Sequence, residues 1–378
     1  MPKILTIVGT RPELIKMSRV IALLDRCSDH LFAHTGQNYD YELNQVFFDD
    51  LKIRKPDFFL NAAGRTTAET IANVIQKSDI LFAQVKPDAV LVYGDTNSCL
   101  CVLAAKRRRI PVFHFEAGNR CFDQRVPEEL NRKVIDHLSD INFVLTEHAR
   151  RYLLAEGVSP QMIIKTGSHM PEVLDFHKKD IDSSQILVQL GLQSKNYILV
   201  SAHREENVDD QSNLAKLVAT LNRLSEVFEC DVVCSTHPRT SARLKNSPHL
   251  KVGQRVRLLK PFGFFDYVFL QKNSLCVVSD SGTITEESAI LQFPAVTIRT
   301  AHERPEGNDS GVLIMSGLEP EYVCECVATE IDLAEQYGSG CEDVIDYLPK
   351  HVSEKVVKAI FSYIPYIKEN VWGSSHEC

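Results

Sequence analysis

Three carboxylates occupy positions in this sequence where acid–base chemistry is readily built. Asp95, in GDTN, and Glu116, in FEAG, each follow a short apolar run of the strand type, and Glu128 opens a helical pattern in PEELNR. The carboxyl ends of parallel strands meet along one edge of a sheet, so we expect the three side chains to converge in one cleft. Their mutual repulsion would raise at least one pKa and leave a proton donor at neutral pH. Taken singly, Asp95 or Glu128 also fits a helix cap or a partner of the helix dipole.

Two histidines follow strand-like runs in the second half of the chain. His203 lies in AHREEN beside an arginine, and His237 lies in THPR one unit later. A histidine at a strand end can transfer a proton near neutral pH. We expect that role for His203, whereas His237 taken alone is more typical of a structural residue.

The turn after the first strand-like run is suited to an anion. The run ends in GTRPELIK, where a glycine directly precedes a helical pattern that carries Arg11 and Lys16. Backbone N–H groups at a helix start and the two cations could together hold a phosphate or a carboxylate. A plain turn with surface charges fits the same residues.

A sharper signal of the same kind is DSGTITEES, near the end of the second half. Ser281, Gly282 and Thr283 separate a strand-like run from a helical one, so the exposed N–H groups of the helix start would face a diphosphate. Glu287, one turn further on, would accept from ribose hydroxyls. Arg304 follows the next strand-like run and is expected near the same cleft. The alternative is an N-cap at the Asp-Ser pair with a capping-box glutamate.

Several classes of protein are excluded by what the sequence lacks. No G-x-G-x-x-G or G-x-x-x-x-G-K-[ST] pattern is present, so neither an NAD fingerprint nor a P-loop is indicated, and we expect no cofactor. Eleven cysteines without a CxxC pair argue against a zinc site and suit a reducing cytoplasm. A net charge of −8 and a pI of about 5.9 argue against nucleic acid. No apolar run is long enough to span a membrane, and no signal-peptide layout opens the chain.

The elements that must position these residues form an alternating α/β pattern. Short runs rich in β-branched residues alternate with amphipathic stretches such as Leu14–Asp25, Thr67–Gln84 and Pro127–Leu138, which predicts βαβ units and parallel sheets. The predicted strands are Ile4–Val8, Leu31–His34, Ala89–Tyr93, Val112–Phe115, Asn142–Leu145 and Ile163–Thr166 in a first series, and Tyr197–Ser201, Asp231–Ser235, Val256–Leu259, Leu275–Ser279 and Ala295–Ile298 in a second.

Two series of strands predict two Rossmann-like α/β domains. The chain has 378 residues, and the polar stretch His177–Ser184 is typical of a linker. We place an N-terminal domain at residues 1–176 and a C-terminal domain at 185–352, with the ligand in the cleft between them. The last helical pattern, Ser353–Tyr363 within 353–378, is expected to pack back on the first domain.

These motifs, in this order, resemble the non-hydrolysing UDP-N-acetylglucosamine 2-epimerase family over nearly the whole chain. They are GTRPELIK, GDTNS, EAG, PEELNR, AHREEN, DSGTITEES and ERPE. The resemblance implies a glycosyltransferase-B-like fold with a UDP-binding C-terminal domain and a homodimer that acts on a UDP-sugar. It makes Asp95, Glu116, Glu128 and His203 the catalytic residues. It also implies that UDP-sugar is bound by Arg11, Lys16, His237, Ser281, Gly282, Thr283, Glu287 and Arg304.

The chemistry implied by the resemblance is inversion of carbon 2 of a UDP-linked amino sugar. The proton on carbon 2 is barely acidic, because no carbonyl is adjacent to it. Elimination of UDP across C1–C2 gives a 2-acetamidoglycal, and UDP then adds back with the proton on the opposite face. That route needs an acid, a base and stabilisation of the departing diphosphate, and no NAD.

The sequence departs from the commonest family pattern at three places. Thr283 replaces the second glycine of the diphosphate turn, NRCFDQ at 119–124 replaces a glycine-containing loop, and Gln37 is followed by Asn38. Together with the aromatic run KPFGFFDY at 260–267, these changes resemble a subgroup in capsule and O-antigen (lipopolysaccharide) synthesis. That subgroup makes UDP-N-acetyl-L-fucosamine from UDP-2-acetamido-2,6-dideoxy-L-talose. The alternatives are epimerisation of UDP-N-acetylglucosamine to UDP-N-acetylmannosamine, a hydrolysing epimerase, a glycosyltransferase and a nucleotide-sugar sensor of the same fold.

Overall fold

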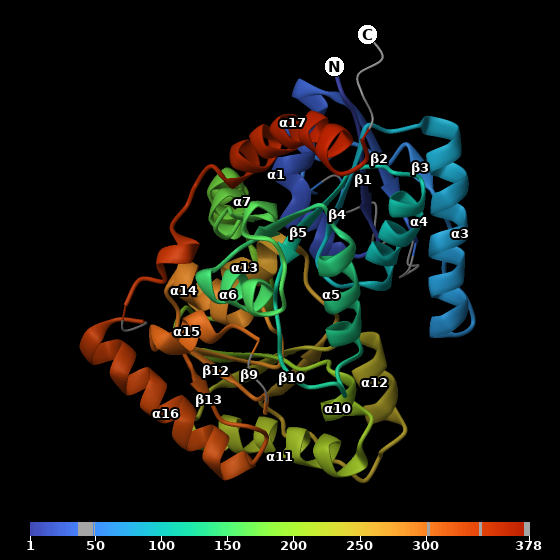
Figure 1. The fold of residues 1–378 in the computed structure, drawn as a ribbon. Helices are drawn as coiled ribbons and strands as arrows, with labels where there is room; N and C mark the ends of the chain where they lie inside the picture. Colours follow the sequence, from blue (N-terminus) through green and yellow to red (C-terminus); the bar gives the residue numbers. More distant parts are fainter. Residues whose placement is uncertain (37–47, 49, 301–302, 340–341, 374–378) are drawn as a thin grey trace. The chain divides into compact units, whose positions relative to one another are not determined.

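The structure is a computed structural model that describes residues 1–373 except 37–47, 49, 301–302 and 340–341 (Figure 1). The departure noted at Gln37 and Asn38 lies outside the described residues. The chain divides into two compact units. Unit 1 comprises Met1–Asp175 and Leu348–Cys378, and unit 2 comprises Phe176–Tyr347. Each is described by itself.

Unit 1 is built on a seven-stranded parallel sheet in the order β3-β2-β1-β4-β5-β6-β7. Its strands are β1 (Lys3–Val8), β2 (Asp29–His34), β3 (Phe58–Phe59), β4 (Ala89–Tyr93), β5 (Val112–Ala117), β6 (Ile141–Val144) and β7 (Ile163–Lys165). Its helices are α1 (Arg11–Cys27), α3 (Thr67–Val85), α4 (Val102–Arg107), α5 (Pro127–Leu138), α6 (Glu147–Ala155), α7 (Met170–Phe176) and α17 (Val352–Asn370), with short 3₁₀ turns at Asn97–Cys101 and Pro160–Met162.

Unit 2 repeats the same arrangement with six parallel strands in the order β10-β9-β8-β11-β12-β13. The strands are β8 (Tyr197–Ser201), β9 (Asp231–Ser235), β10 (Val256–Leu259), β11 (Cys276–Ser279), β12 (Ala295–Thr297) and β13 (Ile314–Met315). The helices are α8 (Lys178–Asp182), α9 (Ile186–Leu190), α10 (Glu205–Val208), α11 (Gln211–Val227), α12 (Pro238–Lys245), α13 (Phe264–Asn273), α14 (Ile284–Leu291), α15 (Pro305–Asp309) and α16 (Pro320–Tyr337), with a 3₁₀ turn at Ile345–Tyr347. The predicted α/β class with two Rossmann-like sheets is confirmed.

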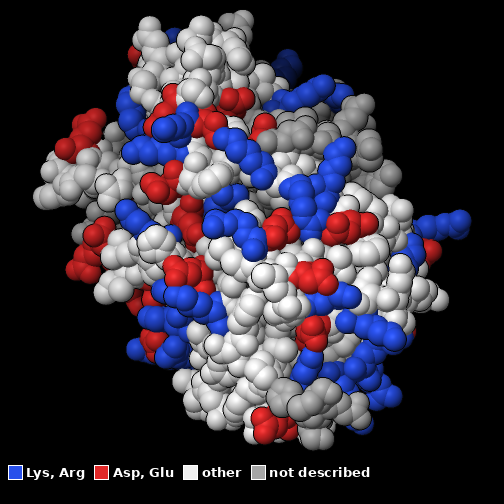
Figure 2. All heavy atoms as spheres, turned by 90° about the horizontal axis from the view of Figure 1, so that it is seen from above, with Lys and Arg blue, Asp and Glu red and all other residues white. Residues whose placement is uncertain are grey.

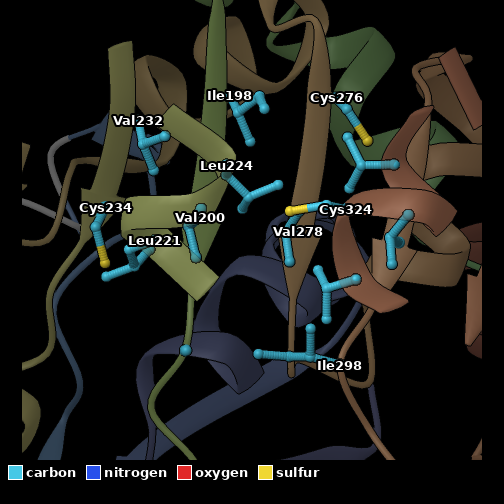
Figure 3. Packing of buried hydrophobic residues seen from close by; sticks show 14 of the residues in the cluster. Ile198, Val200, Leu221, Leu224, Val232, Cys234, Cys276, Val278, Ile298 and Cys324 are labelled. Atoms are coloured by element: carbon cyan, nitrogen blue, oxygen red, sulfur yellow. The ribbon is translucent and has the colours of Figure 1, made fainter. Parts of the chain in front are cut away.

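The strands are apolar on both faces because helices cover both faces of each sheet. In unit 2 successive residues of a strand alternate between two cores. Ile198 and Val200 of β8 join a cluster with Leu221 and Leu224 of α11 and Cys324 of α16 (Figure 3). The intervening residues Tyr197 and Leu199 enter the opposite cluster, which contains residues of α9, α13 and α14.

The stretch His177–Ser184, predicted as a linker, contains the short helix α8 and lies at the start of unit 2. His177 is buried, and its ring lies 5.1 Å from the ring of Phe265. Most polar residues of this stretch are exposed, whereas His177 and Ile181 are buried, so the polar composition concealed two buried contacts.

The last helix of the chain belongs to unit 1. Helix α17 packs along α1 (Figure 1), and its buried residues include Val356, Ile360 and Ile367. The backbone N–H of Ser353 donates to the Glu172 carboxylate at 2.9 Å, and Lys368 donates to Asp88 at 2.5 Å. Unit 1 is therefore completed by residues that follow unit 2 in the sequence.

The face shown in Figure 2 has mixed charge. Lys and Arg side chains alternate with Asp and Glu over the face shown in Figure 2. Among the described helices, none is both long enough and apolar enough to cross a membrane.

Candidate functional site

Four of the sequence-predicted residues follow the strands at the topological switch point of each sheet. The strand order reverses between β1 and β4 in unit 1 and between β8 and β11 in unit 2. At such a point the chain connections that leave the two neighbouring strands run in opposite directions. Doubly wound proteins bind ligands in the crevice that this leaves at the carboxyl ends of the strands. The Arg11 turn and Asp95 follow β1 and β4, and His203 and Ser281 follow β8 and β11.

The helices that start at these two points lack a side-chain cap. Thr66, Thr146 and Asp210 accept hydrogen bonds from the first turns of α3, α6 and α11. The N-cap residues of α1 and α14, which are Thr10 and Thr283, make no such bond. The N–H groups of a helix start without a cap are suited to an anion, because they carry the positive end of the helix dipole.

Glu116 lies within a bulge at the end of β5, not in the loop beyond the strand as the sequence predicted. Its φ of 65° is in the left-handed region, and the β5–β6 register shifts between Phe115 and Ala117. A non-glycine residue with this φ is strained unless its surroundings hold it there, and such residues concentrate at functional sites. Because of the bulge, the Glu116 side chain departs from the pattern in which successive strand residues point to opposite faces of the sheet.

The Glu116 carboxylate is held by donors from three elements. Lys16 of α1 donates to Oε2 at 3.1 Å, and the Tyr93 hydroxyl at the end of β4 donates to the same oxygen. Asn119, in the turn after β5, donates to Oε1 at 3.0 Å. The Lys16 and Glu116 side chains are 9% and 10% exposed. The structure therefore brings two of the predicted residues together as a nearly buried ion pair.

Asp95 is paired with a cation that the sequence analysis passed over. Arg132 of α5 donates to Asp95 at 2.8 Å and to Glu129 at 3.0 Å, so one guanidinium joins the two carboxylates. Glu129 is 1% exposed and also accepts from the backbone N–H of Cys121 at 3.1 Å. These contacts fix the start of α5 against the turn that follows β4.

Glu128 does not join this cluster. It is exposed in the first turn of α5, whereas its neighbour Glu129 takes the buried position. The expected group of three facing carboxylates is therefore not formed, and Asp95 and Glu116 each lie against a cation, Arg132 and Lys16. The signal that separates Glu129 from Glu128 is helical spacing, since Glu129, Arg132 and Ile135 recur every three residues on one buried face.

Glu13 is the titrating carboxyl that sequence reasoning missed. It is 2% exposed in the first turn of α1 and accepts from the Gly9 N–H at 2.6 Å. Burial raises the pKa of Glu13 from 4.5 to about 7, hydrogen bonds from Thr96, Gly9 and Thr10 oppose that rise, and the charge of Asp95 adds to it. Its only sequence signal is a lone acidic residue within the GTRPELIK helix start.

This pKa makes the stability of unit 1 depend on pH. Between pH 4.5 and about 7 the folded chain binds the Glu13 proton and the unfolded chain releases it, so the unfolding free energy falls as pH rises. The full shift corresponds to about 3 kcal/mol. In urea unfolding, we expect the unfolding free energy of Glu13→Gln, measured relative to that of the wild type, to rise by up to this amount between pH 5 and pH 8. Glu147→Gln, at an exposed carboxylate, is the control, and identical pH slopes in wild type and Glu13→Gln would contradict the prediction.

In unit 2 the histidine loop is organised by Asp280, directly after β11. Asp280 is fully buried and accepts from the backbone N–H of His203 at 2.9 Å, the N–H of Arg204 at 2.9 Å and the Asn207 side chain at 3.0 Å. The Nδ1 atom of His203 lies 3.4 Å from the same carboxylate, while the His203 side chain is 45% exposed. Asp280 thus holds the loop that presents the imidazole and does not act as the N-cap that the sequence allowed.

Gly282 leaves room in the diphosphate turn for the side chains of Glu303 and Arg299. An added Cβ would lie 2.4 Å from Glu303 Oε2 and 3.1 Å from Arg299. Glu303 is itself paired with Arg299 at 2.7 Å and with Arg204 at 3.1 Å. The turn is therefore backed by two arginines that share one carboxylate, a positive environment suited to a phosphate.

Glu287 is held in place by its neighbours. Thr283 donates to Oε1 at 2.8 Å and Gln271 of α13 donates to Oε2 at 2.5 Å. The hydroxyls of Ser281 and Thr283 lie 3.0 Å apart. Thr283, one of the departures from the common pattern, therefore orients the residue expected to bind ribose.

His237 and Arg304 have structural contacts. The Nδ1 atom of His237 accepts from the Arg239 N–H at 3.3 Å and caps α12, and its ring lies 6.2 Å from the ring of His203. Arg304 is 7% exposed ahead of α15, and its charge lowers the pKa of Glu306, which burial raises by a larger amount. The structure places His237 beside a predicted catalytic residue, and Arg304 in the interior of unit 2.

The aromatic run expected near a sugar methyl packs internally. Phe262 packs against the core that contains Tyr197, and Phe264 and Phe265 lie 6.4 Å and 5.1 Å from the ring of His177. These contacts agree with the packing interpretation of the run. Among the described residues, no group of three His, Cys, Asp or Glu side chains is arranged to hold a metal ion.

The chain is similar to known proteins along almost its entire length. A family described as UDP-N-acetylglucosamine 2-epimerase matches residues 24–361. The structure of UDP-N-acetylglucosamine 2-epimerase from Rickettsia bellii is 52% identical with a TM-score of 0.91, and the match covers 98% of this chain and 99% of that one.

Two further similar proteins differ in the sugar that their names give. The UDP-GlcNAc 2-epimerase of Methanocaldococcus jannaschii, solved in complex with UDP-GlcNAc and UDP, is 30% identical with a TM-score of 0.88 and coverages of 95% and 99%. The UDP-2,3-diacetamido-2,3-dideoxy-D-glucuronate 2-epimerase of Pseudomonas aeruginosa is 33% identical over 361 residues, which is 92% of this chain and 99% of that protein.

Proposed function

Because the chain belongs to the UDP-N-acetylglucosamine 2-epimerase family and is thus an isomerase of UDP-sugars, we propose that it inverts carbon 2 by eliminating UDP and adding it back. The C2–H bond breaks and its proton passes to a base. The electron pair forms the C1=C2 bond of a 2-acetamidoglycal, and the C1–O bond breaks with its electrons on UDP. Addition of UDP with a proton on the opposite face completes the inversion.

The observation that carries this proposal is the Lys16–Glu116 pair in its bulge. A carboxylate at the carboxyl end of a central strand, in a strained backbone and beside a lysine, is a positioned proton acceptor. We propose Glu116 and Asp95 as acid–base groups of unit 1, with Glu128 at the exposed edge of the same region. His203, oriented by Asp280, is the corresponding group of unit 2.

We assign the binding of UDP to the turns that precede α1 and α14, at the two switch points. The N–H group at Gly282, backed by Arg204 and Arg299, offers charge to a departing diphosphate, and the Thr283 N–H in the same turn donates to the Ser281 hydroxyl at 3.3 Å. Arg11 at the start of α1 and Ser281 add donors, and Glu287 accepts from ribose. His237 and Arg304 support the loops that carry these groups.

Incubation with a UDP-amino sugar in D₂O tests the reaction. We expect a UDP-linked product that carries deuterium at C2 and forms without added NAD, because the glycal must be reprotonated from solvent. Free sugar with UDP would identify a hydrolysing epimerase, and binding without exchange would identify a sensor or a glycosyltransferase. Retention of the C2 hydrogen in the product would refute elimination. Glu116→Gln is the matched inactive sample.

We further propose that the preferred sugar is the 6-deoxy L-sugar that leads to UDP-N-acetyl-L-fucosamine, for capsule or O-antigen synthesis. Support comes from departures that contact the site, since Asn119 binds Glu116 and Thr283 binds Glu287. A methyl contact is worth only about 1 kcal/mol. Strong selection would require the C6 hydroxyl of N-acetylglucosamine to lose its water without gaining a partner.

A comparison of kcat/KM for the two UDP-sugars tests this choice. We expect a higher value for the 6-deoxy L-sugar. Equal values, or faster turnover of UDP-N-acetylglucosamine, would favour the alternative product, UDP-N-acetylmannosamine. A homodimer and a cytoplasmic location stay predictions from the sequence.

A further inference from the structure

Tyr93, the last residue of β4, connects the interior of unit 1 to the Glu116 carboxylate. It is 2% exposed, and its ring lies edge-on to Phe115 at 5.5 Å and to His169 at 5.3 Å. Its hydroxyl donates to Glu116 Oε2. The Tyr93 ring is packed on both sides, and this packing fixes the direction in which its hydroxyl points toward the nearly buried carboxylate.

The contact with His169 assigns a direction to this set of hydrogen bonds. His169 Nε2 lies 3.3 Å from the Tyr93 oxygen. Because the Tyr93 proton is used toward Glu116, Nε2 must carry the hydrogen that reaches the phenol oxygen. The order is then His169 to Tyr93 to Glu116, and a phenol that accepts one hydrogen bond donates a stronger one.

Among the described residues, hydrogen bonds reach Glu116 from three elements. Lys16 approaches from α1, Tyr93 from β4 and Asn119 from the turn after β5, while His169, just before α7, acts through Tyr93. Lys16 and Tyr93 donate to Oε2 and Asn119 donates to Oε1, so hydrogen bonds hold both oxygens of the carboxylate. Hydrogen bonds to the ionised form favour that form.

We propose that Tyr93 is a positioning residue that keeps Glu116 ionised and aimed, so that Glu116 is the group that accepts the proton from C2. This inference rests on the proposed epimerisation. A carboxylate held by several donors is a weaker base, but it is ready to accept a proton at lower pH.

The test is the pH dependence of C2 exchange in Tyr93→Phe. Loss of one hydrogen bond to a charged group should move the acid limb of kcat/KM upward by about one pH unit. The rate then falls about tenfold on the acid side and changes little above the limb. Tyr197→Phe is the matched control, because its buried hydroxyl donates to the Leu270 carbonyl at 2.5 Å in unit 2. Its acid limb should match that of the wild type.

The outcomes separate this inference from the proposed function. A wild type without C2 exchange overturns the function itself. A wild type with exchange, together with a folded Tyr93→Phe whose acid limb is unmoved, overturns the role of Tyr93. If Tyr93→Phe does not fold, the ¹³C carboxyl signal of Glu116 in the wild type, assigned with Glu116→Gln, decides. We expect it to titrate below an ordinary glutamate, and titration at the ordinary pH overturns the proposal.

Discussion

Glu116→Gln is expected to lower kcat for C2 exchange by about a thousandfold, because a positioned base typically contributes 10² to 10⁴ in rate. The amide has nearly the same shape, and it can still accept from Lys16 and Tyr93 through its oxygen. It cannot take a proton from carbon. UDP affinity should change little, since the residues assigned to UDP lie mainly in unit 2.

Single-turnover exchange in D₂O and calorimetric titration with UDP measure the two quantities separately. Glu147→Gln is the control, since this carboxylate is 41% exposed and its ion pairs with Arg150, Arg151 and Lys165 are each 3.9 Å long. Full activity in a folded Glu116→Gln would remove Glu116 from the reaction. A loss of UDP binding in step with the loss of rate would instead indicate a structural role.

Asp280→Ala is expected to lower the unfolding free energy of unit 2 by about 3 kcal/mol or more. The substitution leaves three donors, the N–H groups of His203 and Arg204 and the Asn207 amide, without their buried acceptor. Each unsatisfied buried donor costs about 1–3 kcal/mol. The imidazole of His203 also loses the carboxylate that lies 3.4 Å from it, so kcat should fall in any protein that remains folded.

Urea unfolding followed by a probe in unit 2 gives the stability change. Asp210→Ala is the matched control, because it removes a carboxylate that accepts only from the Asn213 N–H at 2.9 Å as the N-cap of α11. A lost N-cap costs about 1 kcal/mol. Asp280→Ala with no larger effect than Asp210→Ala would show that the loop does not depend on Asp280.

The backbone of the site was predictable because it is encoded locally. Continuous apolar runs such as AVLVY at β4 and YILVS at β8 indicate strands buried on both faces, and the polar residues that follow them mark the strand ends. The strand order then places those ends at the switch points. The match with solved structures of the family confirms the glycosyltransferase-B-like class.

The side-chain arrangement was less predictable because it depends on long-range partners. Nothing near Glu13 in the sequence shows that burial will raise its pKa. The bulge at Glu116 arises from a register shift against β6, which no local pattern records. Asp280 looks like a helix cap until the His203 loop, more than seventy residues earlier, supplies its donors.

The return of α17 to unit 1 has a consequence for biosynthesis. A ribosome makes the seven strands of unit 1 first, then all of unit 2, and only afterwards the helix that covers α1. During that interval the apolar face that later receives Ile360 and Ile367 is uncovered. Unit 1, whose synthesis begins first, is therefore completed last. A nonsense mutation just before residue 348 should leave unit 2 intact and unit 1 exposed to chaperones and proteases.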